Sequence, residues 1–201
     1  MKNKKIPPLS FLTKRLKVRA LERFDYKVWK KAYINSLPNQ NEFDESYLKP
    51  QDINYKNFLN IYKRFKNHTK NGVIYQFFAF YKKYGDLISS TQCALIQRFN
   101  VQKACLGFEI MNNHWRLGYG KELVNGMIEH TFRKLKLHRL EAEIIPSNFS
   151  SIKLVEKLGM KYEGLRRNAG YENGKWEDYS AYAITAEDRG IKNMKPNHTL
   201  L

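Results

Sequence analysis

The hydrophobic period of the chain changes twice between residues 73 and 145, and this order of patterns limits the fold to few architectures. Residues 73–111 show short β-type runs around the turn signal Tyr84-Gly85-Asp86, after which apolar residues recur at helical spacing over Tyr119–Lys136. A further β-type run follows the helix. The strands expected here are Val73–Tyr81, Leu87–Gln97, Cys105–Met111 and Arg139–Ile145. An antiparallel meander followed by one strand–helix–strand crossover predicts a mixed α/β sheet.

The two ends of the chain add shorter elements of the same kinds. At the N-terminal end we expect a strand over Leu16–Leu21, a helix over Tyr26–Leu37, a loop over Pro38–Pro50 and a helix carrying Phe58, Leu59, Tyr62 and Phe65. Pro146-Ser147-Asn148 predicts the cap of a short helix that ends at Gly159. Two last strands, Met160–Leu165 and Lys175–Ile184, are joined across Glu172-Asn173-Gly174. In total we expect about seven strands and about four helices.

A length of 201 residues with 42% hydrophobic residues suits one domain, which we place at residues 1–190. No periodicity continues from Ala186 to Leu201, so we expect a loose C-terminal tail and assign residues 191–201 to it. Two cysteines and five scattered histidines predict neither a disulfide framework nor a metal site. The chain lacks a run long enough for a membrane span and an apolar stretch at its start, so we expect a cytoplasmic protein without membrane contact.

The formal net charge of +17 predicts a positive electrostatic field that attracts polyanions. Residues Met1–Lys31 hold eleven Lys or Arg against Glu22 and Asp25, so much of the excess lies at the N-terminus. RNA, the ribosome or a nucleotide would all suit this charge. A lysine-rich proteome with solvated lysine surfaces would explain it equally well, and the charge alone names no partner.

The segment Trp115-Arg116-Leu117-Gly118-Tyr119-Gly120 lies between a predicted strand and the start of a predicted helix. Unpaired backbone N–H groups and the partial positive charge of a helix start can hold a diphosphate, and glycine lets the backbone approach it closely. Arg116 and Lys121 would add positive charge. Glycines before helices are also common in simple turns, so this segment needs further support.

That support is a family resemblance. Gly107-Phe108-Glu109-Ile110 followed by Trp115–Glu122 resembles the acetyl-CoA signature of the GNAT superfamily of N-acetyltransferases. Later segments resemble its ribosomal-protein-alanine N-acetyltransferase (RimJ/RimL) branch: His138-Arg139-Leu140-Glu141-Ala142, Pro146-x-Asn148-x-x-Ser151, Glu156-Lys157-Leu158-Gly159-Met160 and Gly174-Lys175-Trp176-x-Asp178. The resemblance implies a GNAT fold, a mixed and mostly antiparallel twisted sheet flanked by helices, with acetyl-CoA as cosubstrate. Residues Leu37–Tyr75, where such folds usually choose the acceptor, match least.

Roles in binding the cofactor follow from this resemblance. The amides of Leu117–Glu122 would bind the diphosphate, and the strand Leu106–Met111 would pair with the pantetheine arm beside a splayed neighbouring strand. The implied cofactor-binding residues are Phe108, Ile110, Met111, Arg116, Leu117, Gly118, Tyr119, Gly120, Lys121, Glu122, Asn148 and Ser151. Without the resemblance, Asn148 reads as a helix N-cap and Ser151 as a residue of the first helical turn.

Acyl transfer to an amine needs a base, a donor for the developing oxyanion and an acid for the thiolate. The candidate bases, in order, are Glu141, Glu109, Asp178 and Glu143, although each could instead form an ion pair with the abundant cations. Ser151 leads as the acid by resemblance. A backbone N–H of Leu106–Met111 would stabilise the oxyanion.

The favoured function is acetylation of the N-terminal α-amino group of a ribosomal or other basic protein, with the basic N-terminal region contacting ribosomal RNA. The alternative within the enzyme class is a GNAT enzyme acting on a small amine, a polyamine or an antibiotic. An alternative from another class is a non-catalytic scaffold that binds coenzyme A or RNA.

Overall fold

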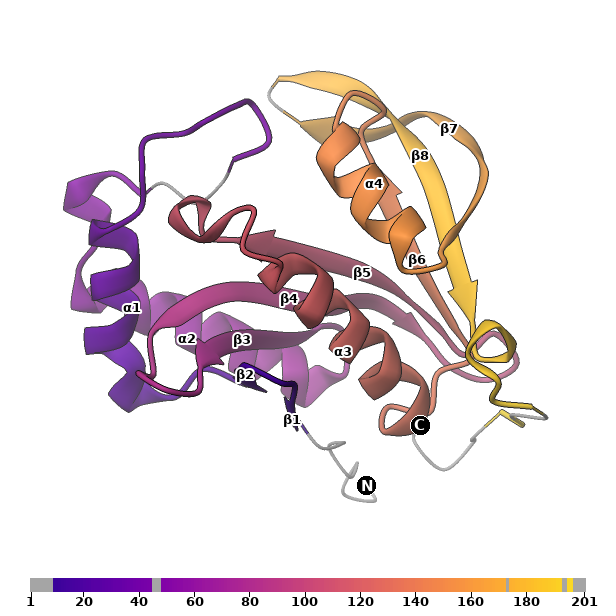
Figure 1. Cartoon of the computed structure of the whole chain (residues 1–201), viewed down its shortest axis with the longest axis horizontal. Coiled ribbons are helices and arrows are strands. Elements are labelled where there is room, and N and C mark those ends of the chain that lie inside the picture. The colour runs from indigo at the N-terminus through magenta and orange to yellow at the C-terminus, as the bar shows by residue number, and fades with distance from the viewer. Residues whose placement is uncertain (1–8, 45–47, 173, 193–194, 197–201) are drawn as a thin grey trace.

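The computed structural model describes residues 9–44, 48–172, 174–192 and 195–196. In these residues one sheet of eight strands has the order β1-β2-β3-β4-β5-β6-β8-β7 (Figure 1). The strands are β1 (Ser10–Leu12), β2 (Leu16–Arg19), β3 (Tyr75–Tyr81), β4 (Leu87–Gln97), β5 (Lys103–Ile110), β6 (Arg139–Ile144), β7 (Lys161–Glu172) and β8 (Lys175–Thr185). The α-helices are α1 (Tyr26–Ile34), α2 (Tyr55–Asn71), α3 (Tyr119–Arg133) and α4 (Phe149–Lys157).

The sheet confirms the predicted mixed and mostly antiparallel class, because only β5 and β6 pair in parallel. It contains one strand more than the seven expected. The additional strand is β1, whose three residues are too few to show an alternating pattern. The expectation of a loose tail from Ala186 is wrong at its start, since Ala186 is fully buried and Glu187–Arg189 form a 3-10 turn. The division at residue 190 stays a prediction, and residues 193–194 and 197–201 lie outside the described part.

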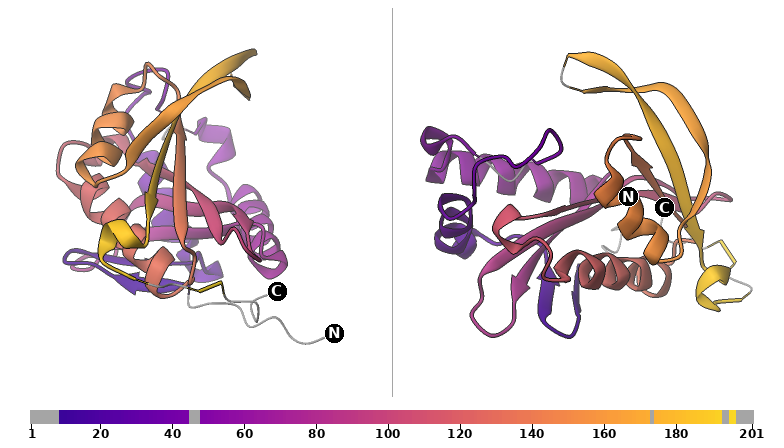
Figure 2. Two further views of the ribbon diagram at one scale, coloured as in Figure 1. Left: turned by 90° about the vertical axis from the view of Figure 1, so that its right-hand side faces the viewer. Right: turned by 45° about the horizontal axis from the view of Figure 1, so that its top comes forward.

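Helices cover both faces of the sheet, with α3 and α4 on one and α1 and α2 on the other (Figures 1 and 2). Strand β3 shows the reason, because successive side chains of a strand point to opposite faces. Phe77 belongs to the core beneath α3, whereas its neighbour Phe78 belongs to the core beneath α1 and α2. A strand covered on both faces therefore reads as a nearly continuous apolar run over Tyr75–Tyr81, interrupted by Gln76.

Strands β5 and β6 pair over only three residues and then separate. Lys103, Ala104 and Cys105 lie opposite Arg139, Leu140 and Glu141. Beyond Cys105, β5 continues beside β4 as far as Ile110, while β6 continues beside β8 as far as Ile144. We call the space between 106–110 and 142–144 the fork. Figure 2 shows the hairpin of β7 and β8 rising away from the first strands of the sheet on the far side of the fork.

Candidate functional site

Helix α3 begins beside the fork, in the predicted diphosphate loop. Its N-cap Gly118 has a φ of 78°, a left-handed conformation that favours glycine, and Arg116 has a φ of 60°. The first hydrogen bond of the helix runs from the Glu122 N–H to the Gly118 carbonyl at 3.2 Å. The N–H groups of Tyr119, Gly120 and Lys121 therefore lack intrahelical acceptors, which makes this turn suited to an anion.

The side chain of Arg15 lies over this loop. Its Nη1 atom donates to the Leu117 carbonyl at 2.9 Å, and its guanidinium carbon lies 4.1 Å from the centre of the Tyr119 ring. Sequence reasoning did not identify Arg15 as a site residue, because its 102-residue separation from Leu117 leaves no local signal. Arg15 thus holds the loop and adds a positive charge next to the exposed N–H groups.

Glu122 has a different role from the one expected. Its N–H is used within the helix, and its carboxylate accepts from Thr13 Oγ1 at 2.5 Å and from Arg15 Nε at 2.6 Å. Burial opposes ionisation, but these hydrogen bonds prevail and hold the pKa of Glu122 below its usual value. Glu122 therefore anchors the turn between β1 and β2 to α3, and we remove it from the set of diphosphate donors.

The end of β5 presents alternate backbone groups to β4 and to the fork. The Gly107 carbonyl accepts from Thr91 Oγ1 at 2.8 Å, and the Met111 N–H donates to the Ile88 carbonyl at 3.0 Å, so both face β4. By the alternation of a strand, the backbone groups of Phe108 and Ile110 face the fork. The Ile110 carbonyl accepts from Trp115 Nε1 at 2.7 Å, and the Met111 N–H is used by β4, so the roles of Phe108 and Ile110 in binding a cofactor stay predictions.

Helix α4 carries Ser151 in its first turn. The side chain of Asn148 accepts from the Ser151 N–H at 3.2 Å and from Ser150 Oγ at 3.1 Å, so its oxygen caps the helix as the simpler interpretation predicted. Ser151 shares a helix face with Leu154, three residues on. A Cβ atom on Gly120 would lie 3.3 Å from Leu154 Cδ2, so α4 packs closely against the start of α3.

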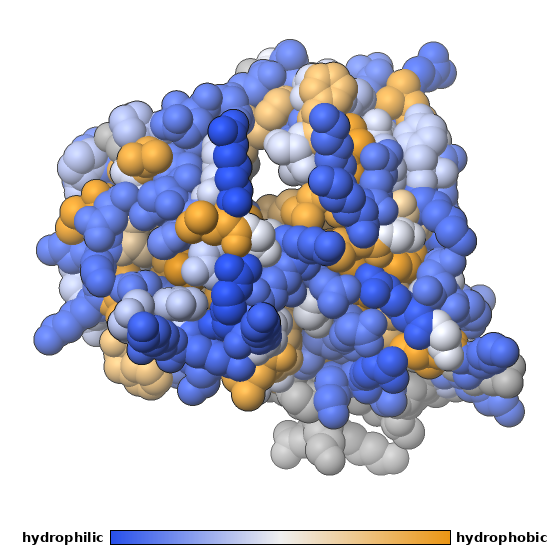
Figure 3. All heavy atoms as spheres, in the orientation of Figure 1, coloured by the Kyte–Doolittle hydropathy of each residue, from blue (hydrophilic) through white to orange (hydrophobic). Residues whose placement is uncertain are grey.

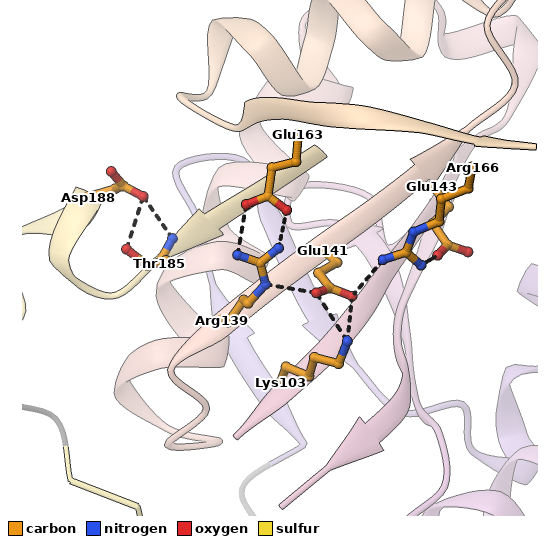
Figure 4. A network of polar contacts seen from close by, with 8 residues as sticks. All are labelled: Lys103, Arg139, Glu141, Glu143, Glu163, Arg166, Thr185 and Asp188. Atoms are coloured by element: carbon orange, nitrogen blue, oxygen red, sulfur yellow. Dashed lines mark hydrogen bonds and ion pairs between the residues drawn. The ribbon is translucent and has the colours of Figure 1, made fainter. Parts of the chain in front are cut away.

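The carboxylate of Glu141 lies in a network of ion pairs on β6 and its neighbours (Figure 4). It contacts Arg139 Nε at 2.7 Å and Lys103 Nζ at 3.1 Å, and Arg166 Nη2 lies 4.0 Å away. Burial raises the pKa of Glu141, but the hydrogen bonds from Arg139 and Lys103 outweigh it and lower the pKa below its usual value. A carboxylate stabilised in this way is a weak base, so these ion pairs weigh against Glu141 as the catalytic base, and its role stays a prediction.

Two further candidate carboxylates also have structural partners. Glu143 pairs with Arg166 (Figure 4), and Asp178 Oδ1 accepts from the Asn168 N–H at 2.8 Å. Asn168 has a φ of 48° and lies where β7 bulges away from β8, so Asp178 supports this irregular turn of the strand. Glu109 lies on β5 at the fork itself, on the face opposite to Ile110.

A loop from the other half of the molecule is tied to this site through Asn112, and we call residues 37–44 the acceptor-side loop. Asn112 Oδ1 accepts from the Leu37 N–H at 2.7 Å, and Asn112 Nδ2 donates to the Leu37 carbonyl at 2.7 Å and to Asp44 Oδ2 at 2.9 Å. Asn112 and Asp44 are both buried. Figure 3 shows the surface notched between the half with α1 and the half with β7 and β8. The acceptor-side loop forms one wall of this notch.

Two kinds of site are not found in the described residues. No group of three His, Cys, Asp or Glu residues there is arranged to hold a metal ion. No helix in the same part of the chain combines the length and apolarity needed to cross a lipid bilayer.

Comparison with known proteins gives consistent results. Residues 15–161 match the family model described as an acetyltransferase (GNAT) domain. The chain is 35% identical over 102 residues to Probable N-acetyltransferase YjcK of Bacillus subtilis (strain 168), covering 51% of this chain and 56% of that protein. It therefore spans only about half the length of that relative. It is 25% identical over 189 residues to the [ribosomal protein uS5]-alanine N-acetyltransferase of Escherichia coli (strain K12), covering 91% and 94% of the two chains.

Solved structures share the fold at lower identity. The ribosomal-protein-S5-alanine acetyltransferase of Vibrio fischeri superposes with a TM-score of 0.73 at 20% identity, covering 94% of this chain and all of that one. The spermidine/spermine N-acetyltransferase SpeG of Vibrio cholerae gives a TM-score of 0.65 at 18% identity, covering 89% and 98%. Enzymes named for protein and for polyamine acceptors therefore share this architecture.

Proposed function

The chain belongs to the acetyltransferase (GNAT) domain family, and from this premise we propose that it transfers the acetyl group of acetyl-CoA to an amine. The observation that carries the proposal is the start of α3, whose N–H groups lack intrahelical acceptors next to the fork between β5 and β6. Acetyl-CoA supplies an activated acyl group on a diphosphate-bearing carrier. A helix start suited to an anion, and the end of β5 that pairs with β4 on one side but with no described strand on the fork side, suit the two parts of that carrier.

The proposed binding residues follow from this fit. The N–H groups of Tyr119, Gly120 and Lys121 would hold the diphosphate, with Arg116 and the Lys121 side chain adding charge. The pantetheine amides would lie along Phe108 and Ile110, as a strand would. Leu117, Gly118 and Asn148 would shape the site rather than contribute charge.

The catalytic roles are assigned to residues on both sides of the fork. Glu109, on the α1 and α2 face, would take the proton from the acceptor amine, directly or through water. The Phe108 N–H would stabilise negative charge on the carbonyl oxygen during transfer. As the new C–N bond forms and the C–S bond breaks, Ser151 on the α3 and α4 face would supply a proton to the sulfur. Glu141 and Asp178 would keep the surrounding strands in place.

For the acceptor, we infer the N-terminal α-amino group of a ribosomal or other basic protein in the cytoplasm. The match to the Escherichia coli enzyme over nearly the whole chain favours this acceptor. The strand face beside the fork supports the same choice, since three glutamates there are matched by three cations and leave no acidic excess for a polyamine (Figure 4). The basic N-terminal region would contact ribosomal RNA. A polyamine or other small amine is the second candidate, because the fold is shared with SpeG.

Mass spectrometry of the chain with acetyl-CoA, peptides beginning with Ala or Ser, and spermidine would test this proposal. Acetylation of the peptides but not of spermidine is expected. Lys121→Gln should raise the KM for acetyl-CoA about tenfold, whereas Lys134→Gln, at the opposite end of α3, should leave it unchanged. Coenzyme A binding without acetylation of any amine would favour the non-catalytic scaffold, and no calorimetric heat with millimolar coenzyme A would refute the assignment.

A further inference from the structure

A second concave surface runs along the outer side of α3, from the start of the helix beside the fork to its C-terminal end. This surface, which we call the α3 groove, has a volume of about 1040 Å³. It is lined by Ser10–Arg15, by the solvent side of α3 and its C-terminal end from Gly118 to Lys134, by Lys157 and Leu158 at the end of α4, and by Arg189. In Figure 3, which has the orientation of Figure 1, mostly hydrophilic residues cover the region of α3.

The α3 groove is more basic than the chain as a whole. Its 18 lining residues include seven Lys or Arg and two carboxylates, Glu122 and Glu129, a net charge of +5. The whole chain carries +17 on 201 residues, so the charge per residue in the groove is about three times the average.

The two carboxylates of the groove are already used by its arginines. Glu122 pairs with Arg15 at 2.6 Å, and Glu129 pairs with Arg133 at 2.7 Å and lies 3.8 Å from Arg189. Four lysines have no ion-pair partner among the described residues. They are Lys14, Lys121, Lys134 and Lys157, all exposed. The groove thus presents a row of uncompensated ammonium groups.

We propose that the α3 groove binds single-stranded RNA through its phosphates. Lys121 and Lys134 are 13 residues apart on one helix, roughly 20 Å along its axis, so the charges suit an extended polyanion rather than a single phosphate. Ammonium groups bind phosphates as point charges without a fixed geometry. The surface is concave and bordered by β1, so it fits one chain better than a flat membrane. Contacts to phosphates carry no information about the bases, so binding is expected to be independent of base sequence.

This inference does not depend on acetyl transfer, since three of the four lysines lie outside the proposed cofactor site. A variant with Lys14→Gln, Lys134→Gln and Lys157→Gln removes three groove charges without touching that site. The matched control, Lys56→Gln, Lys63→Gln and Lys70→Gln, removes three exposed charges from α2 on the opposite face. Both variants have the same net charge, so any difference in their RNA affinity results from where the lost charges lie on the surface.

Fluorescence anisotropy with a labelled 12-nucleotide RNA of mixed sequence, from 50 to 200 mM salt, is the test. The plot of log K against log salt should become shallower by about 2 in the groove variant, at roughly 0.7 per lost phosphate contact, and remain unchanged in the control. Equal losses in both variants would overturn the proposal, as would wild-type binding without salt dependence. Tighter binding of polyglutamate than of RNA would identify an acidic protein as the partner instead. Acetyl-CoA KM should be the same in both variants, so a failed acetylation assay leaves this result interpretable.

Discussion

Replacing Asn112 by alanine should release the acceptor-side loop and destabilise the fold. The substitution removes four hydrogen bonds: two with the backbone of Leu37 at 2.7 Å, one to the Asp44 carboxylate at 2.9 Å and a longer one to the Pro38 carbonyl at 3.4 Å. A neutral hydrogen bond contributes about 1 kcal/mol net and one to a charged group about 1.5–3 kcal/mol. Leu37 is 46% exposed, so its backbone groups can form hydrogen bonds with water instead. Asp44 is only 3% exposed, so its carboxylate cannot reach water unless the structure opens locally. We therefore expect a loss of about 2–4 kcal/mol.

Urea unfolding followed by circular dichroism measures this loss directly. With a slope of roughly 2 kcal/mol per molar urea, the midpoint should fall by about 1–2 M. Hydrogen exchange should show faster exchange over residues 37–44, with α3 and β4 unchanged.

The neighbouring residue provides the control. Asn113 donates one hydrogen bond, to the Asn35 carbonyl at 3.2 Å, and its buried Oδ1 has no partner in the described part of the chain. Asn113→Ala should therefore cost less than about 1 kcal/mol. If Asn112→Ala lowers the midpoint no more than Asn113→Ala, or leaves exchange over 37–44 unchanged, then other contacts hold the loop and the reasoning is wrong.

Three further predictions concern the site. Glu122→Gln should lower the free energy of unfolding by about 1–2 kcal/mol at pH 7. Because the pKa of Glu122 is depressed in the folded state, this difference should be fully present above the unfolded pKa of about 4.3 and should vanish as the pH falls through the folded pKa. Urea titrations at several pH values measure it. Gly118→Ala, at a φ of 78°, should cost about 1 kcal/mol and lower the Tm by roughly 2–4 °C in calorimetry; an unchanged Tm would contradict the conformational argument. Glu109→Gln should lower kcat by about 10²- to 10⁴-fold in a thiol-release assay, whereas Glu141→Gln should lower it less than tenfold; the reverse order would restore Glu141 as the base.

The sequence predicted those parts of the fold whose patterns are local and long. Helix α3 begins at Tyr119 as expected, because its apolar stripe extends over four turns and Gly118 marks its start. Strand β4 has the expected bounds, Leu87–Gln97, because its residues form an uninterrupted β-type run. Strand β7 extends from Lys161 to Glu172, beyond the expected end at Leu165, because its irregular, mostly exposed second half has no alternating pattern.

The parts that could not be predicted depend on residues distant in sequence. The placement of Glu141 and Glu143 on one face followed from strand alternation, but their partners, such as Lys103 and Arg166, come from other strands. The same applies to Asn112, whose partner Leu37 is 75 residues away. A pattern of residue types gives the direction of a side chain, whereas its partner is decided by the tertiary fold.

The short pairing of β5 with β6 has a consequence for how this protein responds to heat. Three residue pairs join the strands, and the polar backbone beyond them forms an internal sheet edge. A molecule with amides along its length could complete this ladder as a removable strand, uniting the halves that flank the opening. Such a molecule, present at a free concentration of 100 times its Kd, would add about 2.7 kcal/mol to the free energy of unfolding of the protein. Melting curves would then report occupancy of the opening, even without any catalytic assay.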